Sequence, residues 1–122
     1  MRYSGAEDRL NPLAPDGVTD ETLGGYMAVH GRAAAFQGSD GEPYTVAVDV
    51  DDSGAPEAPF AAYLVFVRWA QTGTAVMGHM ETGDLVAAPT EAEAREALER
   101  LPLAEVRALL DEAIRRRSEE DR

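Results

Sequence analysis

Two histidines and the acidic residues near them are the side chains of this sequence best suited to acid–base or metal chemistry. His30 lies in one apolar run and Asp49 in the next. If these runs pair as a hairpin, His30 faces Asp49 across the strands, and a carboxylate in that position can fix the tautomer of a histidine that acts as a base. The pair also fits a cross-strand ion pair that helps to set the register, and we favour this interpretation.

His79 and Glu81 are separated by one residue, so their side chains lie on the same side of a strand. Together with His30 they would offer two nitrogens and one oxygen to a metal ion, provided that distant strands brought them together. Because the sequence gives no sign of this convergence, we predict neither a metal site nor a cofactor.

Two arginines in the middle of the chain, Arg32 and Arg68, are expected on the same face of the sheet as the two histidines. Arginine and histidine side chains can bind an anionic ligand. An exposed aromatic side chain beside them, such as Phe66, is typical of an interface. The candidate residues for a ligand or an interface are therefore His30, Arg32, Asp49, Phe66, Arg68, His79 and Glu81. We assign no catalytic residue.

Several common chemistries are excluded because their residues are missing. The chain has no cysteine and no lysine, which excludes thiol nucleophiles, disulfides, thiolate metal sites and the lysine-containing phosphate loop. Its serines lie in segments that resemble turns, loops or termini, and none has the Gly-x-Ser-x-Gly context of a nucleophile elbow. These absences make an enzyme the less favoured reading.

The net charge constrains the partners. There are 23 acidic and 11 basic residues, which gives a formal charge of -12. Nucleic acids and anionic membranes are disfavoured because no basic stripe exists beyond Arg115–Arg117. A basic protein is an allowed partner, and a mimic of nucleic acid is a further hypothesis. With no apolar leader and no membrane-length run, we expect a cytoplasmic location.

The elements that must position these residues follow from periodicity and turn signals. Two predicted hairpins join Tyr26–Phe36 to Tyr44–Asp51, and Phe60–Ala70 to Thr74–Glu81, with a possible fifth strand at 84–87. From Thr90 the apolar spacing becomes helical, and Pro102 separates two helices. We divide the chain into an irregular N-terminal arm (1–24), a single domain (25–117) and a frayed tail (118–122).

The expected fold is α+β, with a four- to five-stranded antiparallel meander sheet and a C-terminal helix-turn-helix pair packed on one face. Two-residue turns at Ser39-Asp40 and Thr72-Gly73 would place an apolar face under the helices. That face holds the valines of 44–51 together with Tyr63, Val65, Val67, Trp69, Val76 and Met80. The opposite, mixed face would hold all seven candidate residues.

We therefore expect a non-catalytic protein-interaction module that binds another protein, or a second copy as a homodimer, through the mixed face. The alternative is a small-molecule protein or enzyme that binds an anionic ligand with His30, His79 and Arg68.

Overall fold

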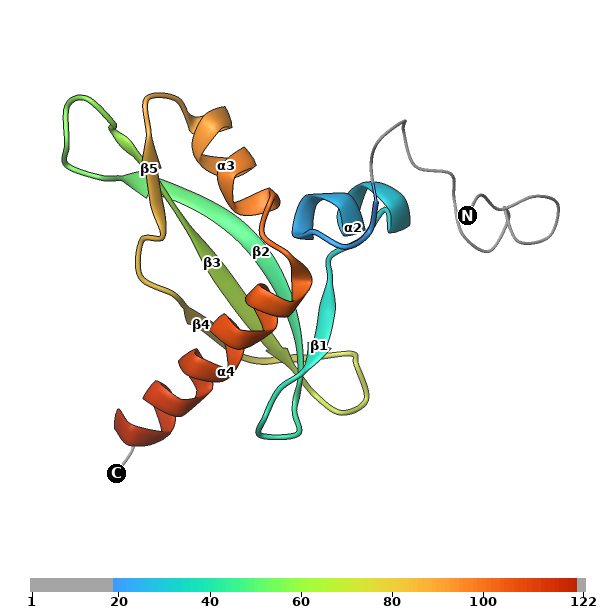
Figure 1. Cartoon of the computed structure of the whole chain (residues 1–122). Coiled ribbons are helices and arrows are strands. Elements are labelled where there is room, and N and C mark those ends of the chain that lie inside the picture. Colours follow the sequence, from blue (N-terminus) through green and yellow to red (C-terminus); the bar gives the residue numbers. More distant parts are fainter. Residues whose placement is uncertain (1–18, 121–122) are drawn as a thin grey trace, which may run out of the picture.

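The computed structural model describes residues 19–120 and shows an α+β fold (Figure 1). As the sequence predicts, an antiparallel sheet is followed by two C-terminal helices that lie on one of its faces. None of the helices in the described range has the length and apolar content to cross a membrane. The elements in chain order are α2 (Leu23–His30), β1 (Ala35–Gln37), β2 (Pro43–Asp52), β3 (Phe60–Trp69), β4 (Val76–Glu81), β5 (Val86–Ala88), α3 (Glu91–Glu99) and α4 (Leu103–Glu120).

The sheet is a meander with β3 at its centre. Its strand order is β1-β2-β3-β4, and β5 also pairs with β3. One edge of β3 pairs with β2 along almost its whole length. The other edge is shared, because β4 pairs with Val65–Trp69 and β5 with Phe60–Ala62. The most apolar strand of the sequence, β3, is therefore paired along both of its edges and lies in the middle of the sheet.

The turn between β1 and β2 is one residue longer than the predicted Ser39-Asp40 turn. The amide of Gly38 donates to Glu42, and the amide of Gly41 donates to Gly38. Gly41 has a φ of 83°, the left-handed conformation that closes three-residue hairpin loops. The extra residue places Ala35 opposite Thr45 and shifts the predicted register by one position.

The second hairpin keeps its predicted register only next to its turn. Trp69 pairs with Val76 as expected, but a bulge follows and Arg68 pairs with Gly78. Met77 is the extra residue, and a bulge reverses the faces of all residues beyond it. His79 therefore lies opposite Val67, so its predicted pairing with Phe66 is wrong. In the same way, Glu81 pairs with Val65, so its predicted pairing with Leu64 is wrong.

The first half of the predicted strand Tyr26–Phe36 is a helix instead. The hydroxyl of Thr22 accepts a hydrogen bond from the amide of Gly25 at the start of α2, and Gly31 ends the helix with a φ of 65°. Helix α2 thus begins within the segment expected to be an irregular arm. Likewise, α4 continues to Glu120 where the sequence predicts fraying.

Two glycines in α2 weaken the helical pattern in the sequence but allow the helix to pack. A Cβ on Gly24 would lie 2.7 Å from the Cβ of Glu99 in α3. The amide of Leu23, which is fully buried, donates to the carbonyl of Leu101 between α3 and α4 at 2.9 Å. Close approach to the C-terminal helices therefore stabilises α2, which local propensity disfavours.

The core lies between the sheet and the helices. Helix α3 begins as predicted, with the hydroxyl of Thr90 accepting from the amide of Glu93 at 3.1 Å. The core consists of side chains from one face of the sheet and the facing sides of the helices. Its largest fully buried members are Phe66, Leu23, Leu64, Leu110, Val46 and Val106.

Candidate functional site

The sheet face that the helices leave uncovered is the candidate functional site, and we call it the open face. Leu64 and Phe66 of β3 are fully buried in the core, so the alternating residues of that strand point to the other side. The face of β3 that holds Tyr63, Val65, Val67 and Trp69 was expected to lie under the helices, and this prediction is wrong. The open face consists of Tyr63, Val65, Val67 and Trp69 of β3, Thr45, Ala47, Asp49 and Asp51 of β2, and Val76, His79 and Glu81 of β4.

One end of the open face is uncharged and is built around Trp69. The indole Nε1 donates to the hydroxyl of Thr45 on β2 at 2.9 Å, which fixes the orientation of the ring. Beside it lies a shallow groove of about 610 Å³ without a charged residue, which we call the Trp69 groove. Its walls are Ala35, Phe36, Gln37, Gly41, Pro43, Tyr44, Thr45, Trp69, Gln71 and Gly73.

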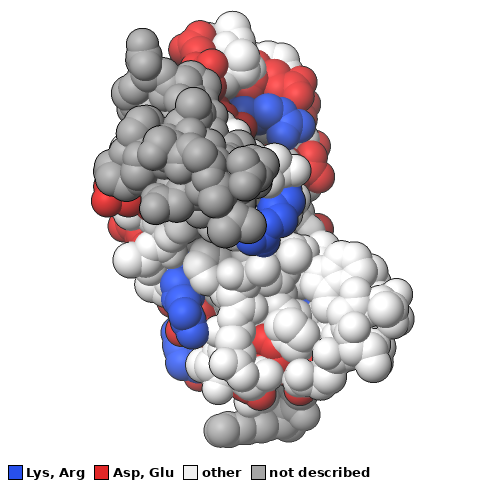
Figure 2. Space-filling view, turned by 90° about the vertical axis from the view of Figure 1, so that its right-hand side faces the viewer, with Lys and Arg blue, Asp and Glu red and all other residues white. Residues whose placement is uncertain are grey.

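The surroundings of the Trp69 groove are also poor in charge. Figure 2 views the molecule from the side on which β1 and the turn between β3 and β4 lie, and below the grey atoms this side has few charged residues. Val76 at the start of β4 is 59% exposed, and its neighbour Met77 is 55% exposed. Exposed apolar side chains next to a fixed aromatic ring are typical of a surface that binds another molecule.

The other end of the open face is acidic. Asp49 accepts a hydrogen bond from the hydroxyl of Tyr63 at 3.2 Å. Desolvation on the sheet, together with the charge of Asp49 and this hydrogen bond, raises the pKa of Tyr63. Asp51 is exposed on the same side of β2. This end therefore presents carboxylates to solvent.

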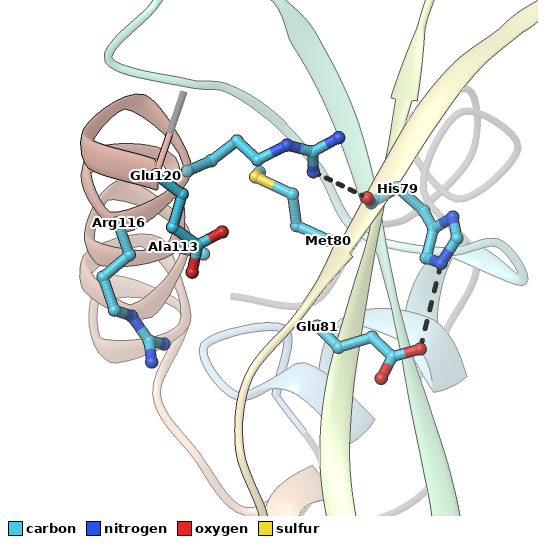
Figure 3. A pocket seen from close by; sticks show the side chains of 7 residues that line it. His79, Met80, Glu81, Ala113, Arg116 and Glu120 are labelled. Atoms are coloured by element: carbon cyan, nitrogen blue, oxygen red, sulfur yellow. Dashed lines mark hydrogen bonds and ion pairs between the residues drawn. The ribbon is translucent and has the colours of Figure 1, made fainter. Parts of the chain in front are cut away.

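His79 and Glu81 lie together on the open face. The imidazole Nε2 is 3.9 Å from a carboxylate oxygen of Glu81, and the two side chains are 63% and 50% exposed. Figure 3 shows both on the side of β4 that faces away from α4, whereas Met80 points toward the helix. A pair as exposed as this one contributes little to stability, so it is available for contact with a partner.

The expected pairing of His30 with Asp49 is wrong, because His30 lies in α2. Its imidazole is 3.2 Å from a carboxylate oxygen of Asp20 and stacks on Tyr26, with 4.3 Å between the ring centroids. Arg32 covers the same tyrosine at 5.3 Å from the ring centroid. These contacts form a local cluster that stabilises the end of α2, away from the sheet faces.

Phe66 and Arg68 are also misplaced by the sequence analysis, because both lie on the helix-covered side of β3. Phe66 is fully buried in the core. The guanidinium of Arg68 extends across the neighbouring strand β4 and donates to the carbonyl of Met77 at 3.2 Å. Of the seven candidates, Asp49, His79 and Glu81 therefore share the open face, and no single pocket unites the set.

His79 lies on the open face as predicted, but only because two wrong predictions compensate for each other. Without the bulge, His79 would share a face with Phe66, and that face was predicted to be open. In the structure the face of Phe66 is covered by the helices, and the bulge moves His79 to the opposite, open face. The sequence pattern does not reveal four site residues of β3, because both alternating sets of side chains on this strand are apolar. These residues are Tyr63, Val65, Val67 and Trp69. The one available signal was that Tyr63 and Trp69 carry polar atoms that suit a surface better than a core.

The described residues do not form a metal centre. Within 19–120, no group of three histidine, aspartate or glutamate side chains could hold a metal ion. The open face thus presents an aromatic ring, fixed by a hydrogen bond, at one end and carboxylates at the other. Comparisons of the chain with protein-family models, curated proteins and solved structures give no match.

Proposed function

We propose that this protein is a non-catalytic interaction module whose open face binds a segment of a basic partner protein. The observation that carries the proposal is the change in character along the strands, from the uncharged Trp69 groove to the carboxylates of Asp49 and Asp51. A segment with apolar residues at one end and arginine or lysine at the other complements this surface when its apolar end lies at Trp69 and its basic end at Asp49 and Asp51.

The edges of the sheet favour binding through the face over the addition of a strand. Along the outer edge of β2, Arg95 donates to the carbonyl of Val48 at 2.9 Å. Further along this edge, the amides of Val50 and Asp52 donate to the side chains of the preceding aspartates. At the opposite edge, arginines donate to the carbonyls of Met77 and His79 in β4. Occupied edge groups discourage pairing with another strand.

Charge also argues against a second copy as the occupant. Asp49, Asp51 and Glu81 are the acidic residues of the open face, and His79 is its basic residue. Two copies, each with a formal charge of -12, would bring carboxylates together when these faces met. Like charges in contact disfavour association, so a partner with basic residues is the better fit.

A fluorescence titration tests the proposal, because Trp69 is the only tryptophan in the chain. The probe is a short synthetic peptide with leucine and phenylalanine at one end and arginine at the other. The comparison peptide replaces each arginine with glutamate. We expect a saturable change in Trp69 emission with the basic peptide, and an affinity at least about tenfold lower with the acidic one.

Two matched variants show whether the open face is responsible. Val67→Arg adds a positive charge at the centre of the face, and Ala92→Arg adds the same charge on the exposed side of α3. We expect Val67→Arg to abolish binding of the basic peptide, because like charges oppose association, and Ala92→Arg to preserve it, with circular dichroism confirming both folds. Equal binding by both variants would contradict the proposal.

A second measurement separates the basic partner from self-association. Light scattering over a range of protein concentrations should show a monomer. A dimer that Val67→Arg disrupts would mean that the open face binds a second copy, and the proposal of a basic partner would then be wrong.

A further inference from the structure

A second surface, on the helix side of β4, gathers basic side chains in this acidic protein. It is a cleft of about 380 Å³ between the end of β3, β4 and the last turns of α4, and we call it the arginine cleft. Figure 3 shows the adjoining part of this gap, between α4 and β4. The residues that line the cleft are Asp40, Tyr44, Arg68, Gly78, His79, Met80, Ile114, Arg117 and Ser118.

The cleft exists because α4 is longer than the surface that it covers. The last buried residue of the helix is Ala113, yet the helix continues to Glu120. Beyond Ala113 the helix extends alongside β4, and its side chains line open space. Arg117 crosses this space and donates from Nη1 to the carbonyl of His79 at 3.3 Å.

Arg68 approaches the same strand edge from the sheet, where its Nη2 donates to the carbonyl of Met77. The two carbonyls belong to residues two apart on one strand, so they lie roughly 7 Å from each other. A guanidinium has five N–H donors, and the carbonyl bond uses one donor in each case. The remaining donors of both arginines can converge on a single tetrahedral anion between them.

Arg68 and Arg117 form no ion pair with a carboxylate within the described part of the chain, where Arg95 and Arg115 do. Other described arginines also lack such a partner, but Arg68 and Arg117 are the two that line this cleft. With about twice as many acids as bases in the sequence, two adjacent arginines that pair with none are available for another anion.

The acidic residue of the cleft is already bound by the protein. Asp40 accepts hydrogen bonds from the hydroxyl of Tyr44 at 2.7 Å and from the amide of Glu42 at 3.0 Å. The cleft therefore holds two guanidinium groups against one hydrogen-bonded carboxylate. Met80 and Ile114 add an apolar wall, which suits an organic group attached to the anion.

We propose that the arginine cleft binds a small organic phosphate monoester, with its phosphate between Arg68 and Arg117 and its organic part against Met80 and Ile114. Bidentate donation by arginine favours phosphate in this position. This site differs from the open face because its two arginines and its apolar wall lie on the helix side of the sheet, although Tyr44 also lines the Trp69 groove and His79 borders both surfaces.

Titration of the labelled protein with phenyl phosphate, followed by NMR, tests the proposal. We expect saturable shifts of the amides of Gly78 and His79 and of the methyl groups of Ile114. Inorganic phosphate should bind at the same place but more weakly, because it lacks the organic group. The absence of saturable shifts at millimolar phenyl phosphate would overturn the proposal, as would shifts confined to other surfaces.

Three variants distinguish a binding site from a structural role of the arginines. Arg68→Gln and Arg117→Gln should each weaken binding of phenyl phosphate by about tenfold or more. Arg115→Gln removes the same charge from the same helix outside the cleft and should leave the affinity unchanged. Because Arg117 is exposed, its variant remains informative if Arg68→Gln fails to fold. Equal weakening by all three variants would show a general charge effect and overturn the proposal.

Discussion

The functional proposals depend on which face of β3 the helices cover, and two neighbouring residues can test this directly. Leu64 is fully buried in the core, whereas the side chain of Val65 lies half-buried on the open face. We therefore predict that Leu64→Ala destabilises the protein several times more than Val65→Ala does. The opposite assignment of faces, which the sequence alone favours, predicts the reverse order.

The magnitudes follow from burial. Leu64→Ala removes three carbon atoms from a closed core, which costs about 0.8 kcal/mol per group in transfer free energy and more for the cavity left behind. We expect a loss of about 3–4 kcal/mol in the free energy of unfolding. Val65→Ala removes two methyl groups that water already reaches, so the loss should be about 1 kcal/mol or less.

Urea unfolding measured by far-UV circular dichroism gives both values, and an unchanged slope with denaturant shows that the two-state comparison holds. Valine is a better strand former than leucine, so strand propensity alone would make Val65→Ala the more costly change and cannot produce the expected order. Equal losses, or a larger loss for Val65→Ala, would refute the assignment of the open face and would remove the basis for partner binding there.

Two further predictions concern the turn and the buried tyrosine. Gly41→Ala should cost about 1 kcal/mol in urea unfolding, because a Cβ there meets no atom within 4 Å and only the positive φ opposes it; no loss would contradict the three-residue turn. Burial, then the hydrogen bond and charge of Asp40, raise the pKa of Tyr44 well above its ordinary value. The protonated phenol therefore stabilises the fold fully below about pH 10, and this contribution falls as the pH rises further toward the pKa of the folded state. The stability of Tyr44→Phe should decline less steeply above pH 10 than that of the natural chain, and parallel declines would contradict this linkage.

Much of the fold could be predicted because local signals agree with the final packing. The hydroxyl of Thr90 and the amide three residues later start α3 where the spacing indicates. The β-branched and aromatic residues of Phe60–Trp69 form the longest apolar strand, which becomes the centre of the sheet. The predicted fifth strand exists as β5, at Val86–Ala88.

The candidate site could be predicted only in part. Asp49, His79 and Glu81 reach the open face, but His30 and Arg32 belong to α2, and Phe66 and Arg68 lie on the covered side. The misplacements come from two features that the pattern does not contain. His30 and Arg32 are misplaced because Leu23–His30 is a helix, and Phe66 and Arg68 because the helices cover the Leu64 side of β3, although both sides of that strand are apolar. The bulge at Met77 adds one residue to β4, and it sets the face of His79 and Glu81 because side chains alternate along a strand.

By itself, the sequence determined the class of the fold, the order of its sheet and C-terminal helices, and the formal charge of -12. Only the tertiary structure decided that the Leu64 side of β3 is buried, that the Trp69 side is open, and that Arg68 and Arg117 both donate to carbonyls of β4. The physical reason is that both sides of β3 are apolar, so each could form a core. The docking of α3 and α4 selects one side, and in doing so it brings together residues that are far apart in the chain.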